Sequence, residues 1–338
     1  MRKLIRFAGF TVLPAVSLFA SINGTVVNRT AGKPQPGVNV TLVKPSQQGM
    51  QTLGTTVSDA SGHFVFEHDQ PGGGPQLLQA TYKGVNYNKL MTPNIPTSGV
   101  ELEIYEPTKS PAVAKIAQQM MLIEPTTSQL RVSETVVIQN DTTTTYKNEA
   151  LGGLRFYLPP SANGQVRVNA QGPQGMPLPQ AAEKTEEDDV FKVNFPIKPG
   201  QTEFEVNYVL PAGSPFNFQG RVVSVKGMPN GPLRLIVPPG VTLGGKDIEL
   251  VGTEPKTQAT IYNVIARDLF STIVTGTGAL RGENDADSTD EGDAPQVTEG
   301  RPQIYSHLGW LVVLAFSVLG VGLIVLFRNS PVRSPYGK

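Results

Sequence analysis

Residues 57–68 read VSDASGHFVFEH, and this stretch decides how the first part of the chain folds. Its serine, aspartate and glycine residues favour a turn, because an aspartate carboxylate accepts hydrogen bonds from nearby amides and glycine tolerates positive φ. The residues on both sides alternate between apolar and polar, as half-buried strands do. We therefore predict a β-hairpin in which Phe64 and Phe66 face the core while His63 and Glu67 face solvent.

The same period-two alternation continues on both sides of this stretch. Short apolar–polar segments separated by Gly, Pro and Asn turns predict a β-sandwich, immunoglobulin-like or transthyretin-like, over residues 21–106. The expected inward residues are Val38, Val40, Leu42, Leu78, Ala80, Tyr82, Val100, Leu102 and Ile104.

Alternating segments after Pro111 predict a second, larger sandwich over residues 110–279. Its expected inward residues are Leu130, Val132, Val136, Ile138, Leu154, Phe156, Leu158, Val166, Val168, Phe204, Val206, Tyr208, Leu210, Leu233, Leu235 and Val237. The predicted fold class is therefore all-β, with two β-sandwich domains.

Three segments of the first domain resemble a known family. They are INGTVV at 22–27, PGVNVTL at 36–42 and TVSDASGHFVF at 56–66. In this order they are similar to the motifs of the carboxypeptidase regulatory-like domain family, over roughly the first third of the chain. The resemblance implies a transthyretin-like sandwich with a carbohydrate-binding-like topology. It also implies a binding or spacer module, since the family is named after an accessory domain of zinc peptidases.

Both ends of the chain carry apolar segments. Residues 1–20 combine a basic head with an apolar run and small residues, which predicts a secretory signal peptide cleaved near Ala20; an uncleaved anchor is the alternative. Residues 308–327 are apolar and uncharged over the length that spans a bilayer, which predicts a transmembrane helix.

Charge around this second segment predicts its orientation. Residues 280–304 are acidic and predict a disordered linker, whereas residues 328–338 are basic and predict a cytoplasmic tail. The expected membrane anchor residues are Leu308, Trp310, Phe327 and Arg328. We thus expect a single-pass protein of the cell membrane whose sandwiches are extracytoplasmic, either periplasmic or at the cell surface.

The overall composition of the chain limits the classes of function that it can have. The 28 basic and 28 acidic residues balance, so no net field favours a nucleic-acid partner. The chain has no cysteine, which excludes disulfides and thiolate metal sites and favours a bacterial envelope protein over a eukaryotic ectodomain.

Candidate catalytic groups are sparse. The three histidines are His63, His68 and His307, and neither a serine triad nor a zinc-peptidase motif surrounds any of them. A glycosidase would need two convergent carboxylates, for which the candidates are Glu134, Glu203 and Glu205, but carboxylates on alternating strands are generally solvated. We predict no catalytic residue, no cofactor and no metal ligand.

The expected function is binding. Sugar recognition uses exposed aromatic rings flanked by polar groups, and the candidates in the first domain are Asn86, Tyr87, Asn88 and Tyr105. The leading hypothesis is a non-enzymatic, membrane-anchored envelope protein that binds a glycan or another envelope protein. The alternatives are an accessory subunit of an envelope transport or biogenesis complex and a hydrolase of unfamiliar design.

Overall fold

The computed structural model describes residues 21–280 apart from 47–48, 68–73, 93–94, 174 and 212–214. Over these residues the chain forms β-strands and two short 3-10 helices, η1 (Pro111–Val113) and η2 (Pro160–Ala162), without any α-helix. The prediction of an all-β fold is therefore confirmed for the described part of the chain.

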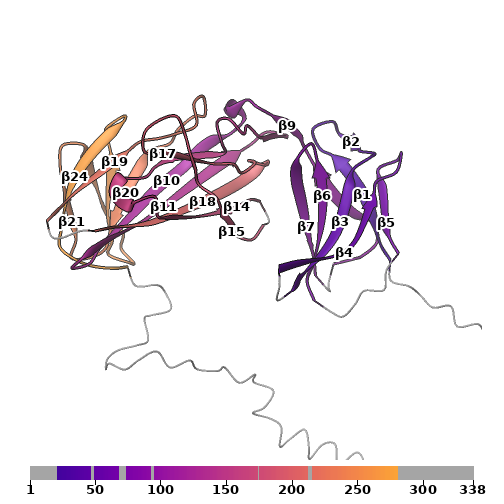
Figure 1. The fold of residues 1–338 in the computed structure, drawn as a ribbon, viewed down its shortest axis with the longest axis horizontal. Helices are drawn as coiled ribbons and strands as arrows, with labels where there is room; N and C mark the ends of the chain where they lie inside the picture. The colour runs from indigo at the N-terminus through magenta and orange to yellow at the C-terminus, as the bar shows by residue number, and fades with distance from the viewer. Residues whose placement is uncertain are drawn as a thin grey trace, which may run out of the picture. The chain divides into compact units, whose positions relative to one another are not determined.

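The first part of the chain forms two four-stranded sheets (Figure 1). In one sheet, β1 (Ile22–Asn28) pairs antiparallel with β2 (Lys33–Pro34) and β5 (His63–Phe66), and parallel with β8 (Val100–Ile104). The other sheet is antiparallel, in the order β4 (Gly49–Val57), β3 (Asn39–Ser46), β6 (Gln76–Tyr82) and β7 (Val85–Met91).

These two sheets enclose an apolar core, because alternate residues of each strand point to the same face. Phe64 and Phe66 are 1% and 5% exposed, whereas His63 and Glu67 are exposed. The faces assigned to these four residues are confirmed. The other expected inward residues are also buried, except Tyr82, which is half-buried.

The predicted hairpin at residues 57–68 is wrong. Strand β4 pairs with β3 in one sheet and β5 pairs with β1 in the other, so the turn between β4 and β5 crosses from sheet to sheet. Ser58 holds the crossing: its Oγ accepts from the Val38 amide at 2.9 Å and donates to the Gln35 carbonyl at 2.8 Å. Apolar periodicity reports which face of a strand is buried but not which strand pairs with it.

Gly62 permits the tight return into β5. Its φ is +79°, and a Cβ atom at this position would lie 2.8 Å from the Pro34 side chain and 3.0 Å from the Val26 carbonyl oxygen. Only glycine avoids both the strained backbone and the clash.

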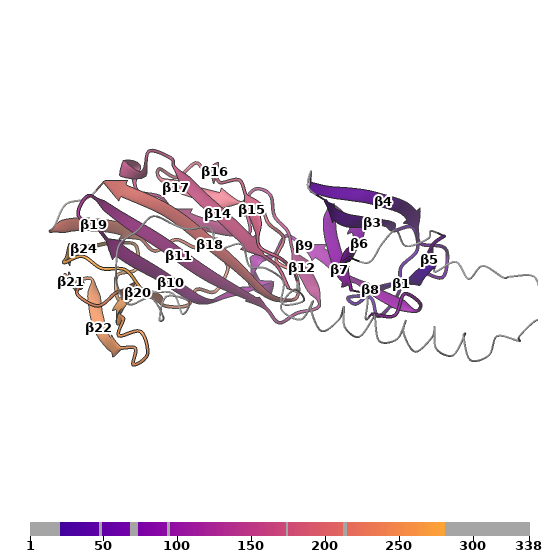
Figure 2. The ribbon, with the colours of Figure 1, turned by 90° about the horizontal axis from the view of Figure 1, so that it is seen from below.

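The second part of the chain is built on one eight-stranded sheet (Figure 2). Its order is β15 (Leu178–Gln180), β14 (Val166–Gln171), β18 (Gly200–Pro211), β11 (Gln129–Asn140), β10 (Lys115–Pro125), β20 (Leu233–Val237), β23 (Thr260–Val264) and β22 (Ile248–Thr253). Strands β10, β11 and β18 are long and pair antiparallel in continuous register apart from one bulge in β10.

Two three-stranded sheets pack against this large sheet. One is β13 (Leu154–Tyr157), β17 (Val190–Val193) and β16 (Glu183–Lys184); the other is β19 (Phe216–Arg221), β24 (Leu269–Thr275) and β21 (Thr242–Gly244). Phe156, Phe204 and Phe218 are at most 1% exposed and join the layers in one core. The expected inward residues of this half are buried, except the half-buried Val166.

Several predictions fall outside the described residues. They are the signal peptide at 1–20, the acidic linker at 280–304 beyond its first residue, the transmembrane helix at 308–327 with its anchor residues, the tail at 328–338, and His68 and His307. None of the described segments is a helix of the length and apolarity that a bilayer crossing requires.

Candidate functional site

The four sequence-predicted ligand residues separate into two environments. On β7, Asn86 and Asn88 point outward and are exposed, whereas Tyr87 between them points inward and is 3% exposed. Tyr105 follows β8 and is half-buried. The structure therefore does not bring these four side chains together on one surface.

Both the hydroxyl and the ring of Tyr87 make contacts inside the protein. Its hydroxyl donates to the Tyr105 carbonyl at 2.8 Å and lies 2.9 Å from the Thr145 hydroxyl, while the Lys198 ammonium lies 5.3 Å from the ring centroid. Burial raises the pKa of Tyr87 to about 12 and lowers the pKa of Lys198 to about 8. A ring enclosed in this way has no free face on which a sugar could stack.

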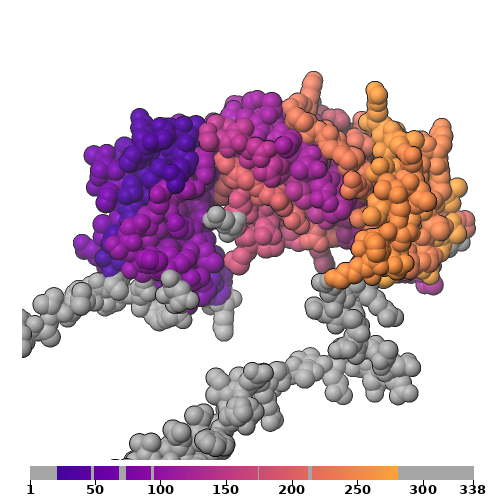
Figure 3. Space-filling model, turned by 180° about the vertical axis from the view of Figure 1, so that it is seen from behind, coloured from indigo at the N-terminus to yellow at the C-terminus, as the bar shows by residue number. Residues whose placement is uncertain are grey.

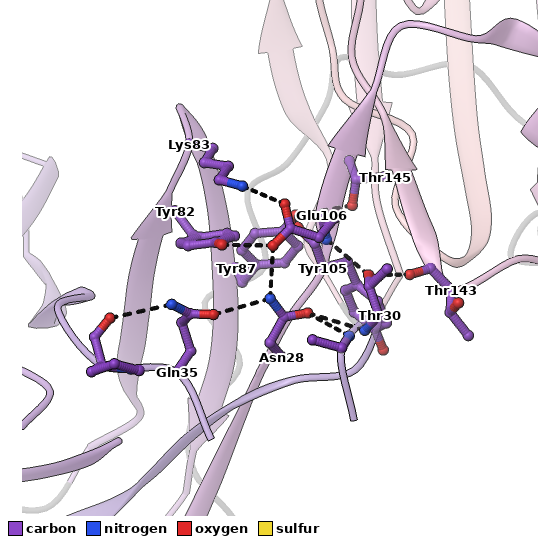
Figure 4. Close-up of polar contacts among 12 residues, drawn as sticks. Asn28, Thr30, Gln35, Tyr82, Lys83, Tyr87, Tyr105, Glu106, Thr143 and Thr145 are labelled. Carbon is purple, nitrogen blue, oxygen red and sulfur yellow. Dashed lines mark hydrogen bonds and ion pairs between the residues drawn. The ribbon is translucent and has the colours of Figure 1, made fainter. Parts of the chain in front are cut away.

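Tyr105 is engaged as well. Its hydroxyl donates to Glu103 at 2.9 Å, and its ring centroid lies 5.9 Å from that of Tyr87 in a tilted arrangement. Burial, with the Glu103 hydrogen bond adding to it, raises the pKa of Tyr105 to about 12. Tyr87 thus contacts the second part of the chain through Thr145 and Lys198, and Tyr105 packs beside it (Figure 4).

Glu106 lies where the two parts of the chain join and bonds to several residues of the first part. Its carboxylate accepts hydrogen bonds from Lys83 at 2.5 Å, from the Tyr82 hydroxyl at 2.7 Å and from Asn28 at 2.9 Å (Figure 4). The Lys83 bond, followed by that from Tyr82, lowers the pKa of Glu106 to about 2. The backbone amide of Glu106 donates to the Thr30 hydroxyl at 2.8 Å.

The chain after Glu106 is paired rather than free. Strand β9 (Glu106–Thr108) pairs parallel with β12 (Thr144–Tyr146), and the Thr30 hydroxyl donates to the Thr143 carbonyl. The described residues up to 280 belong to one compact unit. The domain boundaries at 106 and 110 remain predictions.

The outward face of the β4–β3–β6–β7 sheet carries an ordered set of neutral side chains, all of them polar except Val57. Two cross-strand rows run over the four strands, and we call them together the amide–hydroxyl face. The rows are Val57, Asn39, Thr81, Asn86 and Thr55, Thr41, Gln79, Asn88. A third, mainly apolar row lies beside them: Thr52, Val43, Leu77, Leu90.

Sequence reasoning found Asn86 and Asn88 but missed the rest of this face. The available signal was the neutral polar residue at alternate positions of NVT at 39–41, QAT at 79–81 and NYN at 86–88. The pairing that aligns these segments was not available, because strand register is a tertiary property.

The candidate carboxylates of a glycosidase lie on two different faces of the large sheet. Glu134 is 3% exposed and lies on the core face of β11, where Gln119 donates to it at 2.7 Å. The expectation that it would be solvated is wrong. Glu203 and Glu205 are exposed on the opposite face of β18, since Thr202 and Phe204 between them are buried.

The turn in VSDASGHFVFEH is a hydrogen-bonded structure. One oxygen of Asp59 accepts from the Ser61 amide at 2.8 Å, the Ser61 hydroxyl at 2.7 Å and the His63 amide at 2.9 Å. These bonds, led by that from the Ser61 hydroxyl, lower the pKa of Asp59. The carboxylate is thereby engaged with the turn, as predicted.

A cleft of ≈ 390 Å³ lies between η2 and the turn that precedes β17. The acidic residues at its rim have roles in the surrounding fold. Glu187 pairs with Arg155 at 3.2 Å and with Arg221 at 3.8 Å, and Asp189 adopts φ +59° in the turn. Across the described residues, no three His, Asp or Glu side chains are grouped so that they could hold a metal ion.

Together, the two facing sheets and their crossing turn define a β-sandwich module in the first part of the chain. Residues 21–96 match the family model of the carboxypeptidase regulatory-like domain. The resemblance of the N-terminal segments to this family is thus confirmed.

No curated protein matches the chain. Among solved structures, it is similar to an M1 zinc metallopeptidase from Deinococcus radiodurans, at 13% identity and a TM-score of 0.26 over 48% of this chain and 42% of that one. A two-domain M1 zinc metallopeptidase mutant bound to L-tryptophan gives 12% identity, a TM-score of 0.28 and the same coverages. The chain thus spans less than half the length of these enzymes, and likeness at this level establishes neither its fold nor an activity.

Proposed function

We propose that this chain is a binding protein of a bacterial cell envelope, with its two sandwiches held outside the cytoplasmic membrane by the apolar segment at 308–327. The observation that carries the proposal is the regulatory-like domain at residues 21–96 with an ordered, exposed polar sheet face. The acidic segment before the apolar run and the basic tail after it support this orientation.

The proposed role is non-enzymatic. The placement of the candidate catalytic groups supports it: the Asp59 carboxylate is held by its own turn, and Glu134 is buried on the face opposite to that of Glu203. Asp59 and Glu134 thus have structural roles in the fold. Hydrolysis of a substrate in a screen of the purified protein would instead support the alternative of a hydrolase.

An accessory subunit of an envelope complex is the second candidate. It is favoured by large apolar side chains on the C-terminal strands, whose surface is orange in Figure 3. Leu250 on β22 is 62% exposed, and Leu269 and Ile273 on β24 are 63% and 52% exposed. Apolar side chains that form a contiguous surface patch are typical of contact with a protein partner.

Two measurements test the proposal. A reporter that is active only outside the cytoplasm, fused after Lys338, is expected to be silent, while the same reporter fused after Leu280 is expected to be active. Capture of the full-length chain from native membranes then separates the two candidates: a stoichiometric membrane protein favours the accessory subunit, and retention on immobilised glycans favours the binding protein. Activity of the Lys338 fusion would refute the topology.

A further inference from the structure

We propose that the amide–hydroxyl face binds a neutral glycan chain. This inference rests on the proposed function of an envelope binding protein and adds to it the site and the ligand class. The site is supported by the side-chain hydrogen bonds of the face, by its lack of charged residues and by the apolar row beside it.

Cross-strand hydrogen bonds orient the two asparagines. The Thr81 hydroxyl donates to Asn86 Oδ1 at 2.8 Å, and Gln79 Nε2 donates to Asn88 Oδ1 at 3.2 Å. The amide nitrogens of Asn86 and Asn88 make no hydrogen bond to another described residue, so their donors point to solvent. The Gln79 carbonyl oxygen is likewise available as an acceptor.

This arrangement suits a polyol. A sugar hydroxyl is both donor and acceptor, and it is matched by amide N–H donors and by carbonyl or hydroxyl acceptors at neighbouring positions. Residues paired across strands lie about 5 Å apart and alternate residues along a strand about 6.7 Å apart, so the rows present such groups as a regular grid. Because the asparagines are already held by cross-strand bonds, little side-chain entropy is lost on binding.

The face is electrically neutral. None of the eight residues in its two rows is acidic or basic. An anionic polymer would be recognised by Arg or Lys and a cationic one by carboxylates, and the rows offer neither. The two rows also lack arginine and aromatic side chains, which protein interfaces concentrate at their centre, so the ring of a sugar would lie on the apolar third row rather than on an aromatic side chain.

The third row supplies an apolar edge. Val43 is 8% exposed and lies outside the core cluster of the sandwich, because it points to the same side as Leu77 and Leu90. Leu90 is 48% exposed. Leu90 therefore offers the C–H surface of a pyranose ring a partner, while the sugar hydroxyls reach the polar rows.

The test measures binding to the full-length chain, purified in a detergent without a sugar headgroup. The probes are neutral hexasaccharides of glucose, mannose and N-acetylglucosamine, with polygalacturonate as the anionic comparison. The variants are Asn86→Ala with Asn88→Ala, and Thr55→Arg, which places a long charged side chain over the second row from the exposed edge strand. Asn217→Ala is the matched control, because Asn217 is an exposed asparagine that accepts from Ser271 across strands of the second sandwich.

We expect at least one neutral hexasaccharide to bind. Its affinity should fall at least about tenfold in the double alanine variant, the scale of two lost neutral hydrogen bonds, and in Thr55→Arg, while Asn217→Ala stays at wild type. Unchanged affinity in both face variants would place the glycan elsewhere and overturn the inference, as would a preference for polygalacturonate. Absence of glycan binding together with capture of an envelope protein would overturn the glycan site but leave the proposed function intact. Absence of both, with a normal unfolding midpoint, would remove the proposed function as well.

Discussion

The side-chain amide of Gln119 donates a 2.7 Å hydrogen bond to the carboxylate of Glu134, and both residues are 3% exposed in the core of the second sandwich. Burial raises the pKa of Glu134 from 4.5 to about 7, and the bond from Gln119 opposes this only in part. Folding therefore favours the protonated form of this carboxyl group.

The pH dependence follows from the direction of that shift. Below pH 4.5 the carboxyl group is protonated in both states and does not affect stability. Between pH 4.5 and about 7 it ionises only in the unfolded state, so stability falls, and above pH 7 the loss is constant. The full effect is on the order of 3 kcal/mol.

Glu134→Gln is predicted to remove this loss, because glutamine keeps the shape without the charge. The variant should be more stable than wild type at pH 8 by about 2–3 kcal/mol and close to it at pH 4. Urea unfolding at several pH values measures the difference. Parallel stability profiles of the two proteins would show that Glu134 is not buried as described.

Ser58→Ala tests the crossing turn. The buried hydroxyl bridges Val38 and Gln35, so its removal leaves one backbone amide and one carbonyl without a partner and should cost about 1–3 kcal/mol. Ser61→Ala is the control in the same turn, exposed and expected to change stability by less than about 0.5 kcal/mol. Equal unfolding midpoints for the two variants would contradict the assignment.

Phe66→Ala tests the core face of β5. Phe66 is 5% exposed and packs in edge contact with Phe64, with ring centroids 6.1 Å apart. Its truncation should cost roughly 3–5 kcal/mol in unfolding free energy. His63→Ala, on the exposed side of the same strand, is expected to stay within about 0.5 kcal/mol of wild type, and a comparable loss would mean that the faces are reversed.

Glu106→Gln tests the connection between the two parts of the chain. The folded-state pKa is lowered to about 2, so the carboxylate stabilises the fold above pH 4.5 and this contribution is lost as the pH falls through about 2. The expected cost at pH 7 is about 1 kcal/mol because the group is partly exposed.

Limited proteolysis provides a local readout of the same variant. Lys109 follows β9 and is exposed, so trypsin cleavage at this position should become faster in Glu106→Gln at pH 7. Cleavage at Lys256, which is exposed in a turn of the second sandwich and is followed by Thr257, serves as the internal control. Faster cleavage at both positions would indicate general destabilisation rather than a loosened connection.

Much of the fold was predictable from period-two patterns. The alternation in HFVF at 63–66 assigned Phe64 to the core because neighbouring residues of a strand point to opposite faces in any sheet. Asn86, Tyr87 and Asn88 were named together as ligand candidates without an assignment of strand faces, and alternation along β7 instead buries Tyr87 between the two exposed asparagines. Glu134 was misplaced because a carboxylate was assumed to be solvated, whereas its strand position puts it between the buried Val132 and Val136.

Local sequence thus determined the strands, their buried faces and the turn around Asp59, since these depend on side-chain alternation and on bonds between neighbours along the chain. Only the tertiary structure decided that β4 and β5 lie in different sheets, that Gln79 stands beside Asn88, and that Tyr87 is enclosed near Lys198. These relationships depend on strand pairing and packing between segments far apart in sequence. The cross-strand and packing interactions that select them form only when those segments come together, so no single segment contains them.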